Sequence, residues 1–355
     1  MTVSCSKKDE VDHLARDSLY KLLNNEADQK LKDAFDCATR RGSCDPSIPK
    51  LGIRREWGKL SKEERRSYID AVLCLQSKPS ITPSSEVPGA KSRYDDFVAT
   101  HINQTLYIHG TANFLSWHRY FLRSFEKALQ DECGYEGHQP YWAWEKYAQN
   151  PLNSPLLDGS EYSFGGNGEY QQPQVIPNVS RGCVTTGPFK KSTEFRCYSL
   201  LSSHYNPRCL KRDVSTAIAQ RYTNTKEVVS LITKSPDLST FQFTMQGRPD
   251  KGFFGVHGGG HFTISGDPGG DFFVSPGEPM FWVHHSMIDR VWWIWQNQEL
   301  DERIMQVAGT LTMYNIPPSR KATLDDLIDL GYNAPAIPMR DMTSTTNNSL
   351  WYIYL

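Results

Sequence analysis

The sequence lacks the features that mark membrane proteins and nucleic-acid-binding proteins. It has no run of about 18 apolar residues, the length that spans a bilayer. Its 39 lysines and arginines are balanced by 40 aspartates and glutamates, so there is no basic excess to bind phosphate backbones or anionic lipids. It also contains no internal repeat and no low-complexity tract. We therefore expect neither nucleic acid nor a membrane as a partner.

No CxxC pair occurs among the cysteines, so the usual spacing of zinc sites and thioredoxin-like sites is missing. The even number of eight favours disulfides and a secreted, extracellular protein. Three Asn-x-Ser/Thr sequons, at Asn103, Asn178 and Asn347, are candidates for glycosylation in that setting. Residues 1–7 contain no apolar signal region, so secretion requires a signal outside this chain, and the alternative is an intracellular protein. The cysteines are Cys5, Cys37, Cys44, Cys74, Cys133, Cys183, Cys197 and Cys209.

The composition is that of a folded protein. Apolar residues make up 38% of the 355 residues and aromatic residues 12%, which is too much for a disordered chain. A chain of this length forms one large domain or two small ones. A substantial buried core is therefore expected.

Hydrophobic spacing predicts a mainly α-helical fold with long irregular loops. Helical spacing covers residues 9–35 and 214–233, and residues 61–64 (Ser-Lys-Glu-Glu) are a capping-box variant that opens another helix. The clearest helix runs from a proposed N-cap at Asn113 to residue 132. Residues 150–215 are rich in Pro, Gly and Ser, and we expect a long excursion stapled by disulfides there.

Two of the predicted helices direct histidines toward the interior. In the helix over 113–132, His118 shares a face with large apolar residues. A helix over 279–300 begins with proline, a residue favoured at the first helical position. Its apolar stripe includes His285, with His284 at the edge. The pattern alone leaves open which of these two neighbours points inward.

Seven of the ten histidines fall into two sequence clusters. A lone histidine is most often a hydrogen-bonded core residue, but grouped imidazoles offer several neutral lone pairs to a metal ion. The second cluster is not a zincin, because Gly258 stands where HExxH has its glutamate. A mononuclear zinc site on the second cluster would leave the first unexplained. The clusters are His101, His109 and His118, and then His257, His261, His284 and His285.

Three glycines separate His257 from His261. On a helix the two rings would project to one side. Each glycine, however, costs a helix interior roughly 1 kcal/mol relative to alanine. We therefore expect a glycine-lined turn that allows close approach to a metal, rather than an ordinary helix.

Longer motifs surround these histidines: HGTANFLSWHRYF over residues 109–121 and FWVHHSMIDR over residues 281–290. They resemble the tyrosinase, catechol oxidase and haemocyanin superfamily of binuclear (type-3) copper proteins, and specifically its short fungal polyphenol oxidases. Weaker parallels extend from residues 54–57 to the terminal Tyr-Ile-Tyr over residues 352–354. The resemblance implies a four-helix bundle around a copper pair, in one catalytic domain over residues 1–355 without a C-terminal plug domain.

The resemblance also implies the roles of individual residues. The first copper would be bound by His101, His109 and His118, and the second by His257, His261 and His285. His284 and Asp289 would support the ligands without binding copper. Substrate would meet Gly258, Phe262, Phe272, Phe273, Val274 and Phe281, with one of residues 272–274 shielding the copper entrance.

The implied chemistry is oxidation of o-diphenols to o-quinones while dioxygen is reduced to water. Two cuprous ions, each held by three neutral imidazoles, would supply the electrons to dioxygen. The partners would be small phenols and dioxygen, and the sequence contains no indication of oligomeric state. A reversible oxygen carrier of the haemocyanin kind is the less favoured alternative, because this chain has no spare domain to exclude substrate.

Departures from the family pattern favour catechols over monophenols as substrates. Tyrosinases that hydroxylate monophenols well usually have asparagine after the first ligand of the second copper, and here that residue is Gly258. Such enzymes also have a nearby upstream glutamate, but none lies between Val228 and His257, and the nearest upstream acid is Asp250. Without this deprotonating system we expect a catechol oxidase. A tyrosinase acting on monophenols or methoxyphenols is the alternative.

Two further departures concern residues around the ligands. Some relatives have a cysteine, cross-linked to a ligand, where this chain has Tyr107, so no thioether is expected. The family's Tyr-Trp-Asp-Trp motif is Tyr-Trp-Ala-Trp over residues 141–144, which removes a carboxylate. Glu145 or Asp289 is expected to take over part of its role. The tryptophans of this motif are interpreted as core aromatics.

Overall fold

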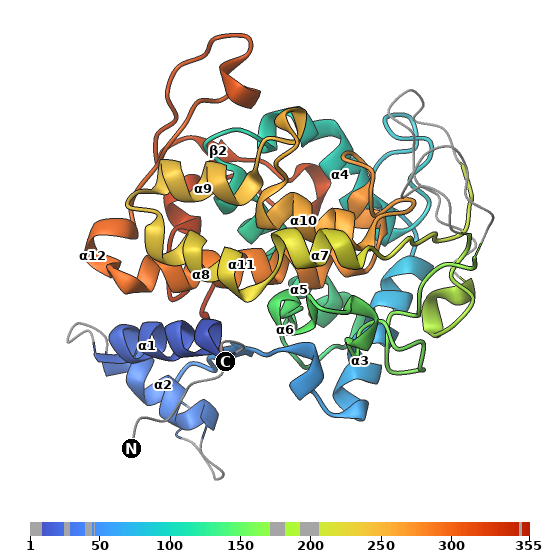
Figure 1. Ribbon diagram of the computed structural model, residues 1–355, viewed down its shortest axis with the longest axis horizontal. Coiled ribbons are helices and arrows are strands. Elements are labelled where there is room, and N and C mark those ends of the chain that lie inside the picture. Colours follow the sequence, from blue (N-terminus) through green and yellow to red (C-terminus); the bar gives the residue numbers. More distant parts are fainter. Residues whose placement is uncertain are drawn as a thin grey trace.

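The computed structural model describes residues 9–24, 29–39, 45, 47–170, 182–191, 206–347 and 350–355, and within them the chain is mainly helical, as predicted (Figure 1). None of the helices in these ranges is long and apolar enough to cross a bilayer. The helices are α1 (Glu10–Asn24), α2 (Gln29–Thr39), α3 (Lys62–Ser77), α4 (Arg93–Ile108), α5 (Phe114–Cys133), α6 (Trp144–Tyr147), α7 (Thr216–Tyr222), α8 (Thr225–Lys234), α9 (Leu238–Gln246), α10 (Gly255–Ile264), α11 (Met280–Gln298) and α12 (Leu300–Arg303), and the strands are β1 (Gly52–Arg54), β2 (Leu327–Ile328), β3 (Ile337–Pro338) and β4 (Tyr352–Tyr354).

Helices α4, α5, α10 and α11 form the four-helix core that the resemblance implied. Helix α11 runs through the middle of the molecule (Figure 1), and every residue from Met280 to Asn297 is buried. Such a helix needs neighbours on all sides. Helices α5, α10, α1 and α8 provide them.

Local sequence signals explain where several helices begin. Ser61 and Glu64 form the predicted capping box at α3: the Ser61 hydroxyl accepts from the Glu64 N–H, and the Glu64 carboxylate accepts from the Ser61 N–H. Asn113 is the N-cap residue of α5, as predicted, but its side chain accepts from the Thr111 hydroxyl and caps no backbone N–H.

Two segments with continuous helical spacing contain two helices each. Residues 9–35 span α1 and the start of α2, while residues 214–233 span α7 and α8. In the second case Asn224 breaks the run, because its side chain accepts from the Glu227 N–H and so starts α8 as a new helix. Helical periodicity shows which face is apolar, and here the Asn224 cap decides where α8 begins.

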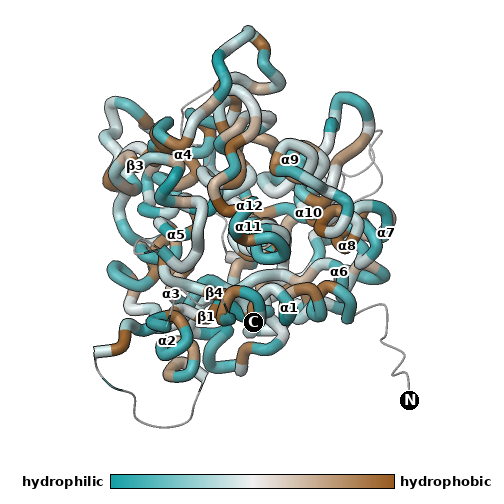
Figure 2. The backbone as a smooth tube through the Cα atoms, turned by 90° about the vertical axis from the view of Figure 1, so that its left-hand side faces the viewer, coloured by the Kyte–Doolittle hydropathy of each residue, from teal (hydrophilic) through white to brown (hydrophobic). Residues whose placement is uncertain are grey.

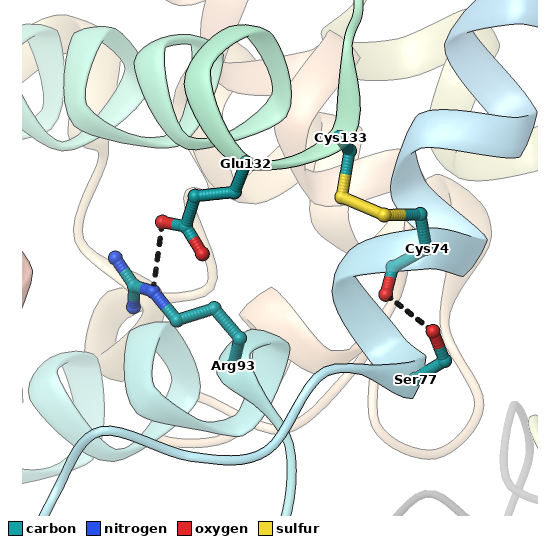
Figure 3. The surroundings of a disulfide bond; sticks show 5 residues. All are labelled: Cys74, Ser77, Arg93, Glu132 and Cys133. Carbon is teal, nitrogen blue, oxygen red and sulfur yellow. Dashed lines mark hydrogen bonds and ion pairs between the residues drawn. A yellow bond between two sulfur atoms is a disulfide. The ribbon is translucent and has the colours of Figure 1, made fainter.

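Disulfides occur, as the cysteine count predicted. Cys74 and Cys133 join the last turns of α3 and α5, next to the ion pair of Arg93 and Glu132 (Figure 3). A second disulfide, Cys183–Cys209, lies within the long loop segment predicted over residues 150–215. Cys5, Cys44, Cys197 and the sequon at Asn178 lie outside the described residues. Asn103 is exposed on α4, and the part-buried Asn347 side chain donates to the Asp341 carbonyl.

A buried ionic network attaches the C-terminal strand to the core. Strand β4 pairs in parallel with β1 near α1 and α2 (Figure 2). The carboxylate of Asp289, on α11, accepts from Arg119 Nε at 2.6 Å, from Arg54 Nη1 at 3.2 Å and from Tyr352 Oη at 2.6 Å. It also accepts from Tyr354. The expectation that Asp289 supports a metal ligand is therefore corrected, because all four partners belong to this structural network.

Candidate metal centre

The first histidine cluster lies between α4 and α5. His101 is on α4, His118 is on α5, and His109 follows the last residue of α4. One ring nitrogen of each lies within 4.8 Å of the others. The structure thus brings together three residues that the sequence placed in one cluster.

Backbone carbonyls orient these three rings. His101 Nδ1 lies 2.8 Å from the Phe273 carbonyl, His109 Nδ1 lies 2.9 Å from the Thr105 carbonyl, and His118 Nδ1 lies 2.8 Å from the Phe114 carbonyl. Because a carbonyl can only accept, each Nδ1 carries the proton and each Nε2 keeps its lone pair. The Nε2 atoms of His101 and His118 are buried and have no hydrogen-bond partner among the described residues. A metal ion would bind the lone pairs of these two atoms.

The second cluster lies between α10 and α11. His257 and His261 are on α10, and His284 and His285 are on α11, with one nitrogen of each within 4.8 Å of the others. His261 Nε2 and His285 Nε2 face each other at 3.1 Å. His257 Nε2 is buried with no partner in the described part of the chain. Neutral nitrogens this close are best accommodated by a shared cation.

Both ring nitrogens of His284 are already engaged. The Trp144 indole N–H donates to His284 Nδ1 at 3.0 Å, and His284 Nε2 donates to the His257 carbonyl at 3.0 Å. A neutral imidazole has one donor and one acceptor, so His284 has no lone pair left for a metal. It braces the backbone of His257 instead. The interpretation of Trp144 as a simple core aromatic missed this contact.

Residues 255–264 form an α-helix, so the expected glycine-lined turn is wrong. Close packing explains why glycines are needed there. A Cβ at Gly260 would lie 2.2 Å from His284 Cε1, and one at Gly259 would lie 2.5 Å from Tyr222 Cβ. The glycines weaken the helix intrinsically, but they let α7 and α11 approach it closely enough to place the histidines.

The two clusters face each other across the core. The rings of His118 and His285 are stacked with centroids 4.5 Å apart, and those of His109 and His257 lie 5.8 Å apart. Burial lowers the pKa of His101 to about 3 and that of His109 to about 4, and it holds the pKa of His118 and His285 well below the usual 6.5. The rings are therefore neutral at physiological pH, which is the form that binds metal.

A cavity of about 280 Å³ opens onto both clusters through His109, His257 and His261. Of the predicted substrate residues, Gly258, Phe262 and Phe272 line it, and the Phe272 ring lies 4.6 Å from the His109 ring.

Phe273, Val274 and Phe281 do not line this cavity. Val274 is buried, the Phe273 carbonyl orients His101, and the Phe281 ring stacks on His285 at 4.2 Å. The expectation that these three contact substrate is corrected, because Val274 is buried and Phe273 and Phe281 contact His101 and His285 instead. Sequence reasoning missed Gln246, Met313 and Tyr314, which line the cavity without belonging to any motif.

The acidic side chains that line the cavity are committed to other partners. Asp250 Oδ1 and Oδ2 each accept from Arg248 at 2.8 Å, and this pairing lowers the pKa of the Asp250 carboxyl. Asp271 Oδ1 accepts from the Phe273 N–H at 2.7 Å and from the Val274 N–H at 3.1 Å. The lowered pKa of Asp250 makes its carboxylate a weaker base, and Asp271 uses one of its oxygens to hold the backbone of residues 273 and 274.

Glu145, the other proposed replacement for the missing family carboxylate, is a buried residue of α6. Its carboxyl oxygens are buried with no hydrogen-bond partner among the described residues. Burial raises the pKa of Glu145 to about 7. The positive charges of Arg290 and Lys146 lower this pKa, and the negative charge of Asp12 raises it, but burial has the largest effect. No ring N–H of the described histidines donates to Glu145, so its contacts do not support the expectation that it holds the ligands.

Comparison with known proteins gives consistent matches. Residues 91–298 match the model for the common central domain of tyrosinase. Tyrosinase P of Aspergillus terreus is 38% identical over 348 residues, covering 90% of this chain and 97% of that protein. N-acetyl-6-hydroxytryptophan oxidase ivoB of Emericella nidulans is 38% identical over 319 residues, covering 79% and 85%. The solved structure of a mutant polyphenol oxidase from Thermothelomyces thermophila superposes with a TM-score of 0.86 at 42% identity, covering 98% of each chain.

Proposed function

This chain belongs to the tyrosinase family, which oxidises phenols with dioxygen at a binuclear copper centre, and we propose that it is a catechol oxidase. The first copper is assigned to His101, His109 and His118, and the second to His257, His261 and His285. These residues fit the ions, because three neutral imidazoles per copper leave positions open for dioxygen and substrate. When bound, the ions transfer electrons from the phenol to dioxygen.

The protein itself supplies orientation and access. The carbonyls that accept from Nδ1 fix the tautomers of the first cluster. His284 and Trp144 fix the position of His257. Gly258 has no side chain, so a phenol ring can lie directly over the start of α10 beside His257 and His261.

The observation that carries the choice of catechols is that both carboxylates lining the cavity, among the described residues, accept hydrogen bonds from neighbouring protein groups. A monophenol must lose its only hydroxyl proton before the ring is hydroxylated. Both oxygens of Asp250 accept from Arg248, one oxygen of Asp271 accepts from the Phe273 N–H, and Gly258 has no side chain that could hold a water molecule. A catechol also releases its hydroxyl protons when it is oxidised, but its first hydroxyl is more acidic than that of a monophenol and its ring needs no hydroxylation, so it depends less on such a base.

Oxygen uptake on 4-methylcatechol and on tyramine tests the proposal. We expect about two coppers per chain by metal analysis, fast uptake with 4-methylcatechol, and slow uptake after a lag with tyramine. Equal initial rates without a lag would refute the assignment to catechol oxidase. Copper loading without uptake on either substrate would instead favour an oxygen carrier.

The variant Gly258→Asn tests the reason for the preference. A Cβ at this position would lie 3.2 Å from Phe254 Cβ, so a small shift accommodates a side chain. An amide there can hold a water molecule near the second cluster, and we expect the tyramine to 4-methylcatechol rate ratio to rise. An unchanged ratio would show that Gly258 does not limit monophenol oxidation.

A tyrosinase with monophenol activity is the second candidate. The relative named for oxidation of N-acetyl-6-hydroxytryptophan acts on a compound with one phenolic hydroxyl. The test above separates the two candidates. We also retain secretion as a proposal, supported by the disulfides Cys74–Cys133 and Cys183–Cys209.

A further inference from the structure

Residues 309–322 form a loop that borders the cavity, although no motif points to them. The loop extends from the body of the molecule at the top of Figure 1, in orange-red. Met313 and Tyr314 line the cavity together with Phe262 and Phe272. A segment distant in sequence from every histidine thus forms part of the wall that a substrate meets.

The loop is attached to the backbone next to His109. The Tyr314 N–H donates to the Gly110 carbonyl at 2.9 Å, and the Ala112 N–H donates to the Thr310 carbonyl at 2.9 Å. Gly110 has a φ of 62°, and a Cβ there would lie 3.0 Å from Tyr314 Cε1. Glycine therefore permits both the left-handed turn and the close approach of the Tyr314 ring.

On its other side the loop contacts the segment that leads into α10. The Arg248 guanidinium lies 4.4 Å from the centroid of the Tyr314 ring, a cation–π contact. Arg248 is fixed by Asp250 and by antiparallel pairing with Phe253. Arg248 does not line the cavity, whereas Tyr314 does.

The backbone of the loop is held in an uncommon conformation. Tyr314 and Asn315 have φ values of 52° and 59°, in the left-handed region that non-glycine residues rarely adopt. Hydrogen bonds inside the loop maintain it: Asn315 Oδ1 accepts from the Ser319 N–H at 2.8 Å, and Ser319 Oγ accepts from the Thr312 N–H at 3.2 Å. A strained backbone conformation persists only where the contacts around it hold it in place, and such conformations are frequent at functional sites. Tyr314 is therefore positioned before substrate arrives.

Building on the proposed function, we propose that Tyr314 determines specificity by packing against the substituent opposite the reacting hydroxyls. The substrate class that fits is a catechol with an uncharged aryl substituent. Phe262, Phe272 and Met313 make the rest of this wall apolar, and the charge of Asp250 is paired with Arg248. An offset or edge-on aromatic contact with Tyr314 stabilises an aryl group more than a methyl group.

Binding and turnover should be compared with matched ligands on the copper-loaded protein. Resorcinol and 4-phenylresorcinol lack adjacent hydroxyls and cannot be oxidised directly to o-quinones, so calorimetry in the absence of dioxygen can measure their dissociation constants without turnover. 4-Methylcatechol and 4-phenylcatechol give the corresponding kcat/KM values. The variants are Tyr314→Ala, Tyr314→Leu and Tyr314→Phe, with Tyr20→Ala, at an exposed tyrosine on α1, as the control.

We expect the wild type to favour the phenyl ligand in both assays, and Tyr314→Ala to reduce that preference about fivefold to tenfold. Tyr314→Leu, which keeps bulk beside Gly110, should reduce it as well. Tyr314→Phe and Tyr20→Ala should retain it. Copper analysis of each variant checks that the centre is intact.

No preference for the phenyl ligand in the wild type, or an unchanged preference in both Tyr314→Ala and Tyr314→Leu, would overturn the proposal. An equal loss of affinity, or of kcat/KM, for the phenyl ligand and for its smaller counterpart would also overturn the proposal, because it indicates general damage to the site. If the wild type oxidises neither catechol, the proposed function fails, and the calorimetric comparison still decides the role of Tyr314.

Discussion

The substitution Gly260→Ala tests whether close packing of α10 on α11 positions the second cluster. A Cβ at this position would lie 2.2 Å from His284 Cε1, whereas ordinary contact begins at 3.4 Å, so the ring or the helix must move by about 1.2 Å. His284 cannot move freely, because hydrogen bonds of 3.0 Å to Trp144 and 3.0 Å to the His257 carbonyl hold it.

The expected loss of stability follows from three effects. Overpacking a core costs about 1–3 kcal/mol, and a broken buried hydrogen bond adds about 1–3 kcal/mol. Replacing glycine in a helix returns about 1 kcal/mol. We expect Gly260→Ala to lower the free energy of unfolding by about 3 kcal/mol, as measured by urea titration of the copper-free protein with tryptophan fluorescence. Copper bound per chain should also fall, because His257 shifts.

Two further variants make this test specific. Gly258→Ala is the matched control, since its Cβ would lie 3.2 Å from Phe254 Cβ and the same helix propensity is gained. The double variant Gly260→Ala, His284→Ala removes the ring that causes the clash, so its loss should be smaller than the sum of the two single losses. Equal stability of Gly260→Ala and Gly258→Ala, or strict additivity in the double variant, would refute the packing argument.

Three other substitutions test separate parts of the molecule. His261→Ala should lower the copper content to about one ion per chain, since two imidazoles remain for the second ion; two bound coppers would contradict the ligand set. Glu145 has a pKa of about 7 when folded against a usual 4.5. The folded state therefore binds the extra proton between these values, and wild-type stability should fall by about 3 kcal/mol as pH rises through that window. Glu145→Gln should abolish this fall in urea titrations at pH 4.5 and 8, and parallel pH profiles would argue against it. Asp289→Asn leaves the buried Arg119 cation without its anionic partner and should cost about 3–5 kcal/mol in thermal or urea unfolding, whereas Asp301→Asn, at an exposed site, should have little effect.

Local chemistry allowed much of the site to be predicted from the sequence. Metal binding needs several imidazoles, and helical periodicity requires His118 and His285 to share faces with apolar residues, so both clusters could be recognised from spacing alone. The capping box at Ser61 was predictable for the same reason, because donor and acceptor lie within one helical turn. Family resemblance supplied the four-helix core.

Contacts between distant segments decided the rest. Spacing left open which of His284 and His285 faces the metal, and the hydrogen bonds of His284 to Trp144 and His257 show that its nitrogens are occupied. The glycines of α10 predicted a turn, since intrinsic propensity disfavours a helix there, but burial against α7 and α11 outweighs that propensity. Tyr314 reaches the cavity only because its loop bonds to Gly110, a contact between residues about 200 positions apart in the chain. Such pairings depend on the whole packed core, so no local pattern in the sequence reveals them.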